Sequence, residues 1–194
     1  RYLPNPTDFP KEAAPRGGGY LLYTGRLSPE KGLPGLIQAF AETPELLLKI
    51  AGRGPEEAAL QRLVRDLGLA NVEFLGFKAP AELAVIRRAA EAVVLPTLSY
   101  ENASGALLEA LAEGIPCLAT RIGGSPELVE EGRQGFLVKP GDVGDWVRVL
   151  KQFQERTEGE RRILGESGRE KIRTTRTWGI HVEQLESIYK EVGG

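Results

Sequence analysis

The side chains best suited to chemistry in this chain are a few charged residues that lie beside glycines. Arg26 and Lys31 lie in the glycine-bounded segment 25–32. A planar guanidinium fork and a flexible ammonium group together suit the two phosphates of a diphosphate. The segment is not a Walker A loop, because glycine follows Lys31 and the glycine spacing is wrong. The alternative is that Lys31 only begins a helix while Arg26 pairs with a carboxylate.

Two glutamates eight residues apart form the second candidate group. Glu101 follows an apolar run, and Glu109 lies in a helical pattern of otherwise apolar residues. A carboxylate is costly to bury there without a partner, and carboxylates accept hydrogen bonds well from paired ribose hydroxyls. Ser104 and Gly105 would let the start of this helix approach an anion closely. The alternative is that Glu101 caps the helix and Glu109 faces solvent.

Two further glycine-containing turns are candidates for binding a ligand. Residues 52–55 read Gly-Arg-Gly-Pro, which is half of a dinucleotide fingerprint. Glu57 stands where the third glycine belongs, and the segment follows the second apolar run rather than the first, so a tight turn is the alternative. Gly123 and Gly124 either add backbone amides to an anion site or form a plain strand-to-helix turn.

The elements that position these residues follow from the apolar pattern. Short continuous apolar runs alternate with helical patterns, which predicts an α/β fold: a Rossmann-like open parallel sheet with helices on both faces. Ligands bind such sheets at the carboxyl ends of the strands. We expect strands at residues 20–24, 46–51, 72–75, 92–95, 117–120 and 136–138. We expect helices at residues 33–42, 55–67, 80–90, 105–113 and 126–131, with only helices beyond residue 145 and a last one at 178–191.

Composition excludes several classes of function. The 194 residues include 25 basic and 27 acidic side chains, and this near balance argues against a dedicated nucleic-acid binder. The single cysteine, Cys117, is expected in the core, and the single histidine, His181, rules out a histidine-based zinc site or triad. No apolar run approaches the ~20 residues of a membrane span. The lone cysteine fits a cytoplasmic location, and the composition favours a thermophilic source.

The two ends of the chain differ in character from the middle. Residues 1–19 are rich in proline and glycine and predict a linker. The chain has no methionine, even at position 1, so we expect it to be a piece of a longer polypeptide. The last helix carries an apolar stripe that includes Trp178 and Tyr189 and must cover a core or a missing neighbour. Nine basic against five acidic residues over 148–176 predict a solvated face, with a membrane or partner surface as the alternative.

In their order along the chain, these motifs resemble the C-terminal, donor-binding domain of retaining GT-B glycosyltransferases (group 1, family 4). The resemblance covers residues 5–178. Its carriers are Gly25-Arg26-Leu27 with Pro29-Glu30-Lys31-Gly32, Gly52-x-Gly54-Pro55, Val72-x-Phe74-Leu75-Gly76, Glu101-x7-Glu109 with Ala110-Leu111-Ala112-x-Gly114-x-Pro116, Gly123-Gly124-x-Pro126-Glu127-Leu128-Val129, and Gly135-Phe136-Leu137-Val138.

The resemblance implies roles at the matching positions. Arg26 and Lys31 would neutralise the diphosphate of a nucleotide sugar as this leaving group departs. Glu101 would hold the hydroxyls of the donor sugar and Glu109 those of the ribose. The implied catalytic residues are Arg26, Lys31 and Glu101. The implied donor-binding residues are Gly25, Phe77, Lys78, Ser104, Gly105, Leu108 and Glu109, with Phe77 and Lys78 in the loop that meets the base. The resemblance implies no metal ligands and no cofactor beyond the nucleotide-sugar co-substrate.

The resemblance also implies an organisation and partners. Residues 1–19 would be an interdomain linker, 20–176 the nucleotide-sugar-binding domain, and 177–194 a helix that packs on an N-terminal acceptor-binding domain absent here. The parent would transfer a sugar in the cytoplasm or at the cytoplasmic face of the membrane, whereas this piece would bind the donor without catalysing transfer. Asn102-Ala103-Ser104 departs from the x-Phe-Gly that commonly follows the family's first glutamate. A non-catalytic nucleotide-binding module and a dinucleotide-dependent oxidoreductase are the alternatives.

Overall fold

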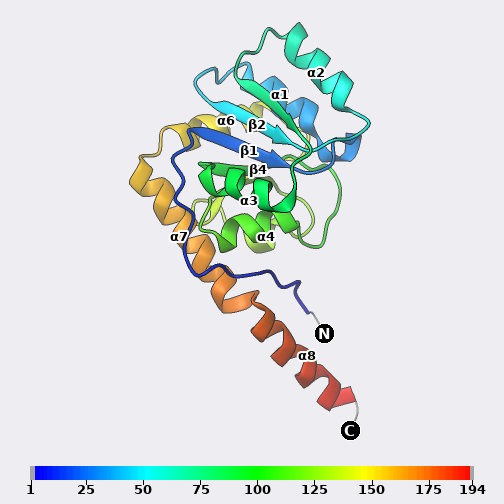
Figure 1. Cartoon of the computed structure of the whole chain (residues 1–194), viewed down its shortest axis with the longest axis vertical. Helices are drawn as coiled ribbons and strands as arrows, with labels where there is room; N and C mark the ends of the chain where they lie inside the picture. The colour runs from blue at the N-terminus through cyan, green and yellow to red at the C-terminus, as the bar shows by residue number, and fades with distance from the viewer. Residues whose placement is uncertain (1–2, 193–194) are drawn as a thin grey trace.

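One six-stranded sheet organises the chain. The computed structural model describes residues 3–192, and all strand pairs in it are parallel, in the order β3-β2-β1-β4-β5-β6 (Figure 1). The sheet confirms the predicted open parallel architecture. The strands are β1 (Tyr20–Thr24), β2 (Leu47–Ala51), β3 (Val72–Gly76), β4 (Ala92–Leu95), β5 (Cys117–Thr120) and β6 (Gly135–Val138).

Strands β1, β4, β5 and β6 are largely apolar without alternation because both faces of the sheet are covered there, whereas β2 and β3 carry Lys49 and Glu73. In β1, Leu21 and Tyr23 join the core on one face, whereas Tyr20 and Leu22 join the core on the other. All four side chains are buried. The sheet is therefore the middle layer of three, as its continuous apolar runs predict.

Helices cover both faces of this sheet. Helices α1, α2 and α6 contribute Phe40, Leu60 and Trp146 to one core, and α3, α4 and α5 pack on the other face. Helix α7 lies against α4 (Figure 1). The helices are α1 (Leu33–Phe40), α2 (Glu57–Asp66), α3 (Pro80–Ala89), α4 (Gly105–Ala112), α5 (Ser125–Leu128), α6 (Val143–Gln154), α7 (Glu158–Thr175) and α8 (Trp178–Val192), with a short 3₁₀ helix η1 (Pro29–Lys31).

The predicted elements all exist, and the differences lie at their ends. Helix α2 begins at Glu57 rather than at residue 55, because Pro55 lies in the preceding turn. Leu67 lies just beyond the end of this helix and is 41% exposed. Helix α5 stops at Leu128 rather than at residue 131, because the next residue, Val129, is extended.

The chain crosses over between β1 and β4. From β1 it builds outward through β2 and β3, and it then returns to the other side of β1 to form β4. Such a crossover leaves a crevice at the carboxyl ends of the two strands. Two loops border it, and they are joined by a hydrogen bond from the Leu98 amide to the Glu30 carbonyl at 2.8 Å. The sheet therefore brings the segments around Lys31 and Glu101 together.

Glycines allow the loops at this edge to pack backbone against backbone. A Cβ atom on Gly52 would lie 1.8 Å from the carbonyl oxygen of Gly25, and one on Gly54 would lie 2.1 Å from that of Leu27. The Gly-Arg-Gly-Pro segment is therefore a tight turn that packs on the neighbouring loop. The structure explains these two glycines without a dinucleotide.

The N-terminal segment and α8 lie side by side beyond the sheet (Figure 1). The Thr7 amide donates to the Arg176 carbonyl at 2.9 Å, and Trp178 Nε1 donates to Asp8 Oδ1 at 3.1 Å. His181 Nδ1 lies 3.0 Å from the Pro4 carbonyl oxygen, a contact that joins α8 to the N-terminal segment. Trp178, Val182 and Tyr189 remain exposed on α8.

Gly52→Ala tests the backbone packing at the sheet edge. Gly52 has φ +148°, and the added methyl group would meet the Gly25 carbonyl. We expect a loss of about 3 kcal/mol in the free energy of unfolding, from the combined cost of strain and overpacking. Urea titration followed by circular dichroism measures it.

Gly68→Ala is the matched control. Gly68 also has a positive φ, +65°, but no atom lies within 4 Å of the position that the added methyl group would occupy. Its cost should be about 1 kcal/mol, from backbone strain alone. Equal losses at the two sites would contradict the packing argument.

Candidate functional site

An ion pair lies where the chain crosses over in the sheet. Lys31, at the end of η1, pairs through Nζ with Oε1 of Glu101, in the loop after β4. Both side chains are partly buried, with 22% and 27% of their surface exposed. The alternative that Glu101 caps α4 is wrong, because the N-cap is Ser104 and no side chain caps that helix.

The backbone around Glu101 is held on two sides. The Gly124 amide donates to the Glu101 carbonyl at 2.8 Å, and a Cβ atom on Gly123 would lie 2.4 Å from the same oxygen. Thr120 Oγ1 donates to the Thr97 carbonyl at 2.6 Å. The Gly123-Gly124 turn therefore supports the loop that carries Glu101.

Arg26 and Gly25 lie beside this pair on the loop after β1. Arg26 is exposed and forms no ion pair with any residue in the described range 3–192. Its carbonyl accepts a hydrogen bond from the buried Tyr23 hydroxyl at 2.8 Å. Burial, with smaller contributions from the charges of Glu101 and Glu30, raises the pKa of Tyr23 well above its ordinary value. Tyr23 thus stays a neutral donor that anchors the loop.

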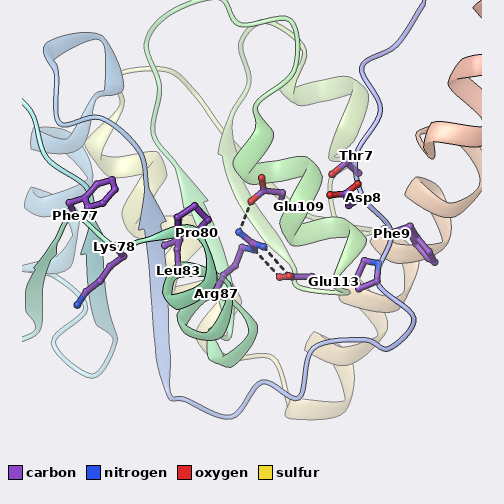
Figure 2. A pocket seen from close by; sticks show the side chains of 11 residues that line it. Thr7, Asp8, Phe9, Phe77, Lys78, Pro80, Leu83, Arg87, Glu109 and Glu113 are labelled. Carbon is purple, nitrogen blue, oxygen red and sulfur yellow. Dashed lines mark hydrogen bonds and ion pairs between the residues drawn. The ribbon is translucent and has the colours of Figure 1, made fainter.

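Two adjoining cavities run from this loop toward α4. The smaller has a volume of about 320 Å³ and the larger about 620 Å³, and they share Phe77, Lys78 and Leu83. We call the pair the edge groove. Figure 2 shows Phe77 and Lys78 on one side of the larger cavity, with Glu109 of α4 opposite. The groove is lined by Gly25, Arg26, Ala51, Gly52, Arg53, Phe77, Lys78, Pro80, Leu83, Arg87, Glu109, Glu113 and the N-terminal residues Thr7, Asp8, Phe9 and Pro10.

A third cavity, of about 330 Å³, lies on the other side of the Glu101 loop. Tyr100, Glu101 and Asn102 line it, together with the Gly123-Gly124 turn. Glu101 therefore lines this cavity and also pairs with Lys31. Asn102 and Ala103, two of the three residues that differ from the x-Phe-Gly pattern common in the family, line this cavity rather than the edge groove.

The start of α4 is open to solvent. No side chain caps the helix, and nothing lies within 4 Å of a Cβ position on Gly105. The first amides of a helix lack internal partners and attract anions. Leu108, in contrast, is buried in the core under α4 and lines none of the three cavities.

Sequence reasoning missed a buried guanidinium under the edge groove. Arg87 of α3 forms a bidentate pair with Glu113, from Nε at 2.8 Å and from Nη2 at 2.9 Å, and its Nη1 donates to Glu109 Oε2 at 2.5 Å (Figure 2). Burial opposes the charged form of Arg87, but the hydrogen bonds and charge of Glu113, with the charge of Glu109, raise its pKa above the ordinary value. Glu109 therefore has a partner, and it is about half exposed to the groove.

The basic residues of α6 and α7 are mostly paired within the chain. Seven of the nine over residues 148–176 form ion pairs with carboxylates, and Arg169 donates instead to the carbonyls of Ala112, Pro10 and Lys11. This pairing favours a solvated face over a cationic surface for a membrane. Over residues 3–192, no helix has the length and apolar character needed to cross a bilayer. Within the same residues, no group of three or more His, Cys, Asp or Glu side chains could hold a metal ion.

The order of the strands and the groove at their carboxyl ends define a class. The chain is a Rossmann-like α/β domain with its candidate site at the crossover between β1 and β4. Residues 4–171 match the family of glycosyl transferases group 1, and the chain belongs to this family.

Relatives agree with this assignment. A D-inositol 3-phosphate glycosyltransferase of Corynebacterium aurimucosum is 34% identical over 98% of this chain and 48% of its own length. The chain thus spans about half the length of the curated relatives it matches. A sucrose-phosphate synthase structure from Thermosynechococcus elongatus has a TM-score of 0.84 at 27% identity, over 99% of this chain and 52% of that one. Anabaena Alr3699/HepE, solved with UDP and glucose, has a TM-score of 0.80 at 25% identity, over 89% and 48%.

Arg87→Met tests the energetics of the buried charges. It leaves the Glu113 carboxylate buried without its partner, and we expect a loss of about 3 kcal/mol or more in the free energy of unfolding. The double change Arg87→Met/Glu113→Leu removes both charges and should recover most of that loss. Urea titration of the three proteins measures both effects.

Lys78→Met is the control for this series. Lys78 pairs with Glu82 one helical turn away on the surface. Such exposed pairs contribute only about 0.5 kcal/mol. A double variant as unstable as Arg87→Met would contradict the assignment of the cost to an unpaired buried charge.

Proposed function

We propose that this chain is the donor-binding half of a retaining glycosyltransferase that takes a sugar from a nucleoside-diphosphate sugar. The observation that carries the proposal is the Lys31–Glu101 pair at the crossover, beside a groove that leads to Glu109. Cations, a sugar-facing carboxylate and a ribose-facing carboxylate would then follow one another along one edge of the sheet. The acceptor would be held by an N-terminal domain of the parent.

Arg26 and Lys31 are the groups for the diphosphate in this proposal. Both follow β1, and Arg26 lines the smaller cavity of the edge groove. Negative charge grows on the diphosphate as the sugar–phosphate bond breaks, and preorganised cations stabilise that charge. The open amides at the start of α4, at Ser104 and Gly105, supply further donors for the phosphates or the sugar.

The two glutamates hold hydroxyl groups in this proposal. Glu101 lies between Lys31 and the third cavity, so a sugar in that cavity would lie next to both its carboxylate and the leaving group. Glu109 faces the larger cavity and would accept from the ribose, while Phe77 and Lys78 would border the base. Leu108 would contribute only through the packing of α4.

The relatives support the nucleotide class. The Anabaena protein has been solved with UDP and, separately, with UDP-glucose, at 25% and 26% identity to this chain. UDP is therefore our first choice of nucleotide.

Calorimetric titration with UDP, GDP and ADP tests the donor site. We expect one nucleotide, UDP first, to bind in preference, and Lys31→Ala and Glu109→Ala each to weaken it by about 10- to 100-fold. Each variant removes a charge-assisted hydrogen bond worth about 1.5–3 kcal/mol.

Lys151→Ala is the control for these titrations. Lys151 is exposed on α6, away from the sheet edge, and should leave the affinity unchanged. The proposal is falsified if the wild type binds none of the three nucleotides, or if the site variants bind as well as the control.

A turnover assay tests the division of labour between the two halves. This chain alone should bind UDP-glucose but should not transfer the glucose to an acceptor, because the proposed acceptor-binding domain is not part of it. Sugar release is followed by radiolabel, with the full-length parent as the positive control. Transfer by the chain alone would overturn the proposal. A parent that binds donor without turnover would instead indicate a non-catalytic nucleotide-binding module.

A further inference from the structure

The guanidinium of Arg87 is held rigidly beneath the edge groove. Its Nε and Nη2 both donate to the carboxylate of Glu113, and each of these two side chains is only 9% exposed. A bidentate pair fixes the plane of the guanidinium as well as its position. The position of the remaining terminal nitrogen, Nη1, is therefore fixed as well.

That nitrogen donates to Glu109. The bond runs from Nη1 to Oε2 at 2.5 Å (Figure 2), and no residue in the range 3–192 donates to the other oxygen, Oε1. Glu109 is 49% exposed and lines the larger cavity. One oxygen of the carboxylate is thus held from below, while the other is free on the side of the groove.

A buried ion pair is a poor source of stability, because desolvation offsets most of its attraction. An apolar pair of similar size would fill the space between α3 and α4 with less cost. The arrangement is better explained by orientation, since a carboxylate on a flexible glutamate loses rotamer freedom when a ligand binds, and a prior restraint lowers that cost.

We propose that Arg87 is a positioning residue that orients Glu109 to accept a hydrogen bond from a ribose hydroxyl. The inference rests on the ribose role of Glu109 in the proposed function. Arg87 acts through Glu109 and does not itself touch the nucleotide. A site built to bind a hydroxyl rejects an analogue that lacks it, because its polar groups are left unpaired. The preference of the chain for ribonucleotides over dideoxyribonucleotides therefore depends on Arg87.

The test compares UDP with 2′,3′-dideoxyuridine diphosphate by calorimetry. The wild type should prefer UDP by about 10- to 100-fold. Arg87→Met/Glu113→Leu, which removes the pair without leaving a buried charge, should lose about 10-fold of this preference. Its affinity for the dideoxy analogue should stay within about threefold of the wild type. Adding Glu109→Ala to this variant should bring little further loss, because the two residues act in series.

Two variants keep the test decisive. Arg88→Met, on the next residue of α3 and outside the groove lining, should leave the preference unchanged. If the double variant does not fold, Arg87→Lys replaces it. That change keeps a cation under the groove but lacks the fork that joins both carboxylates, so it too should lower the preference.

The outcomes separate this inference from the proposed function. Equal weakening of both ligands would show a purely structural role or a direct phosphate contact, and an unchanged preference would show that Glu109 needs no orientation; either overturns the inference alone. A wild type that binds both ligands equally removes the ribose role of Glu109 and the inference with it. A wild type that binds neither overturns the proposed function as a whole.

Discussion

The close approach of backbones at the carboxyl edge of the sheet is the constraint on which the candidate site depends. The turn after β2 touches the loop after β1 at Gly52, and the turn after β5 touches the loop after β4 at Gly124, in each case against a carbonyl oxygen. Gly32 touches the Pro96 carbonyl in the same way. These contacts fix the spacing between the loop backbones. The main chain therefore sets where the side chains of Lys31 and Glu101 begin, and the ion pair between them joins their charged ends.

Helix α3 is held on the sheet in a different way from the helices on the opposite face. Helices α1 and α6 bury large apolar side chains such as Phe40 and Trp146 against one face. Helix α3 has a small apolar core, and Arg87 is its most deeply buried long side chain. It is joined to its neighbours by polar contacts, which include the bond from the Tyr20 hydroxyl to the Ile86 carbonyl at 2.6 Å. Polar bonds depend on direction more than apolar contacts do, and α3 borders the part of the groove that Glu109 lines.

Sequence reasoning could predict whatever depends on local pattern plus topology. Continuous apolar runs located β1, β4 and β5 at the bounds that the structure shows, and the rule for parallel sheets brought Lys31 and Glu101 to one edge although 70 residues separate them. It could not predict the Arg87–Glu113 pair. Arg87 occupies the last turn of α3 and Glu113 the end of α4, where charged residues are ordinary features of helix ends. Only the packing of α3 against α4 shows that these two charges are buried together.

The difference between Arg26 and Lys31 has a kinetic consequence. A cation without a counter-ion acts on an anion at a distance, whereas a paired cation acts only after its partner has been displaced. Arg26 is exposed and forms no ion pair within residues 3–192, so in the proposed function its field would draw an anion toward the edge and would weaken as salt is added. Lys31 is neutralised by Glu101 until contact is made. In the proposed function, Arg26 would therefore affect mainly how fast an anion arrives, and Lys31 how long it stays bound.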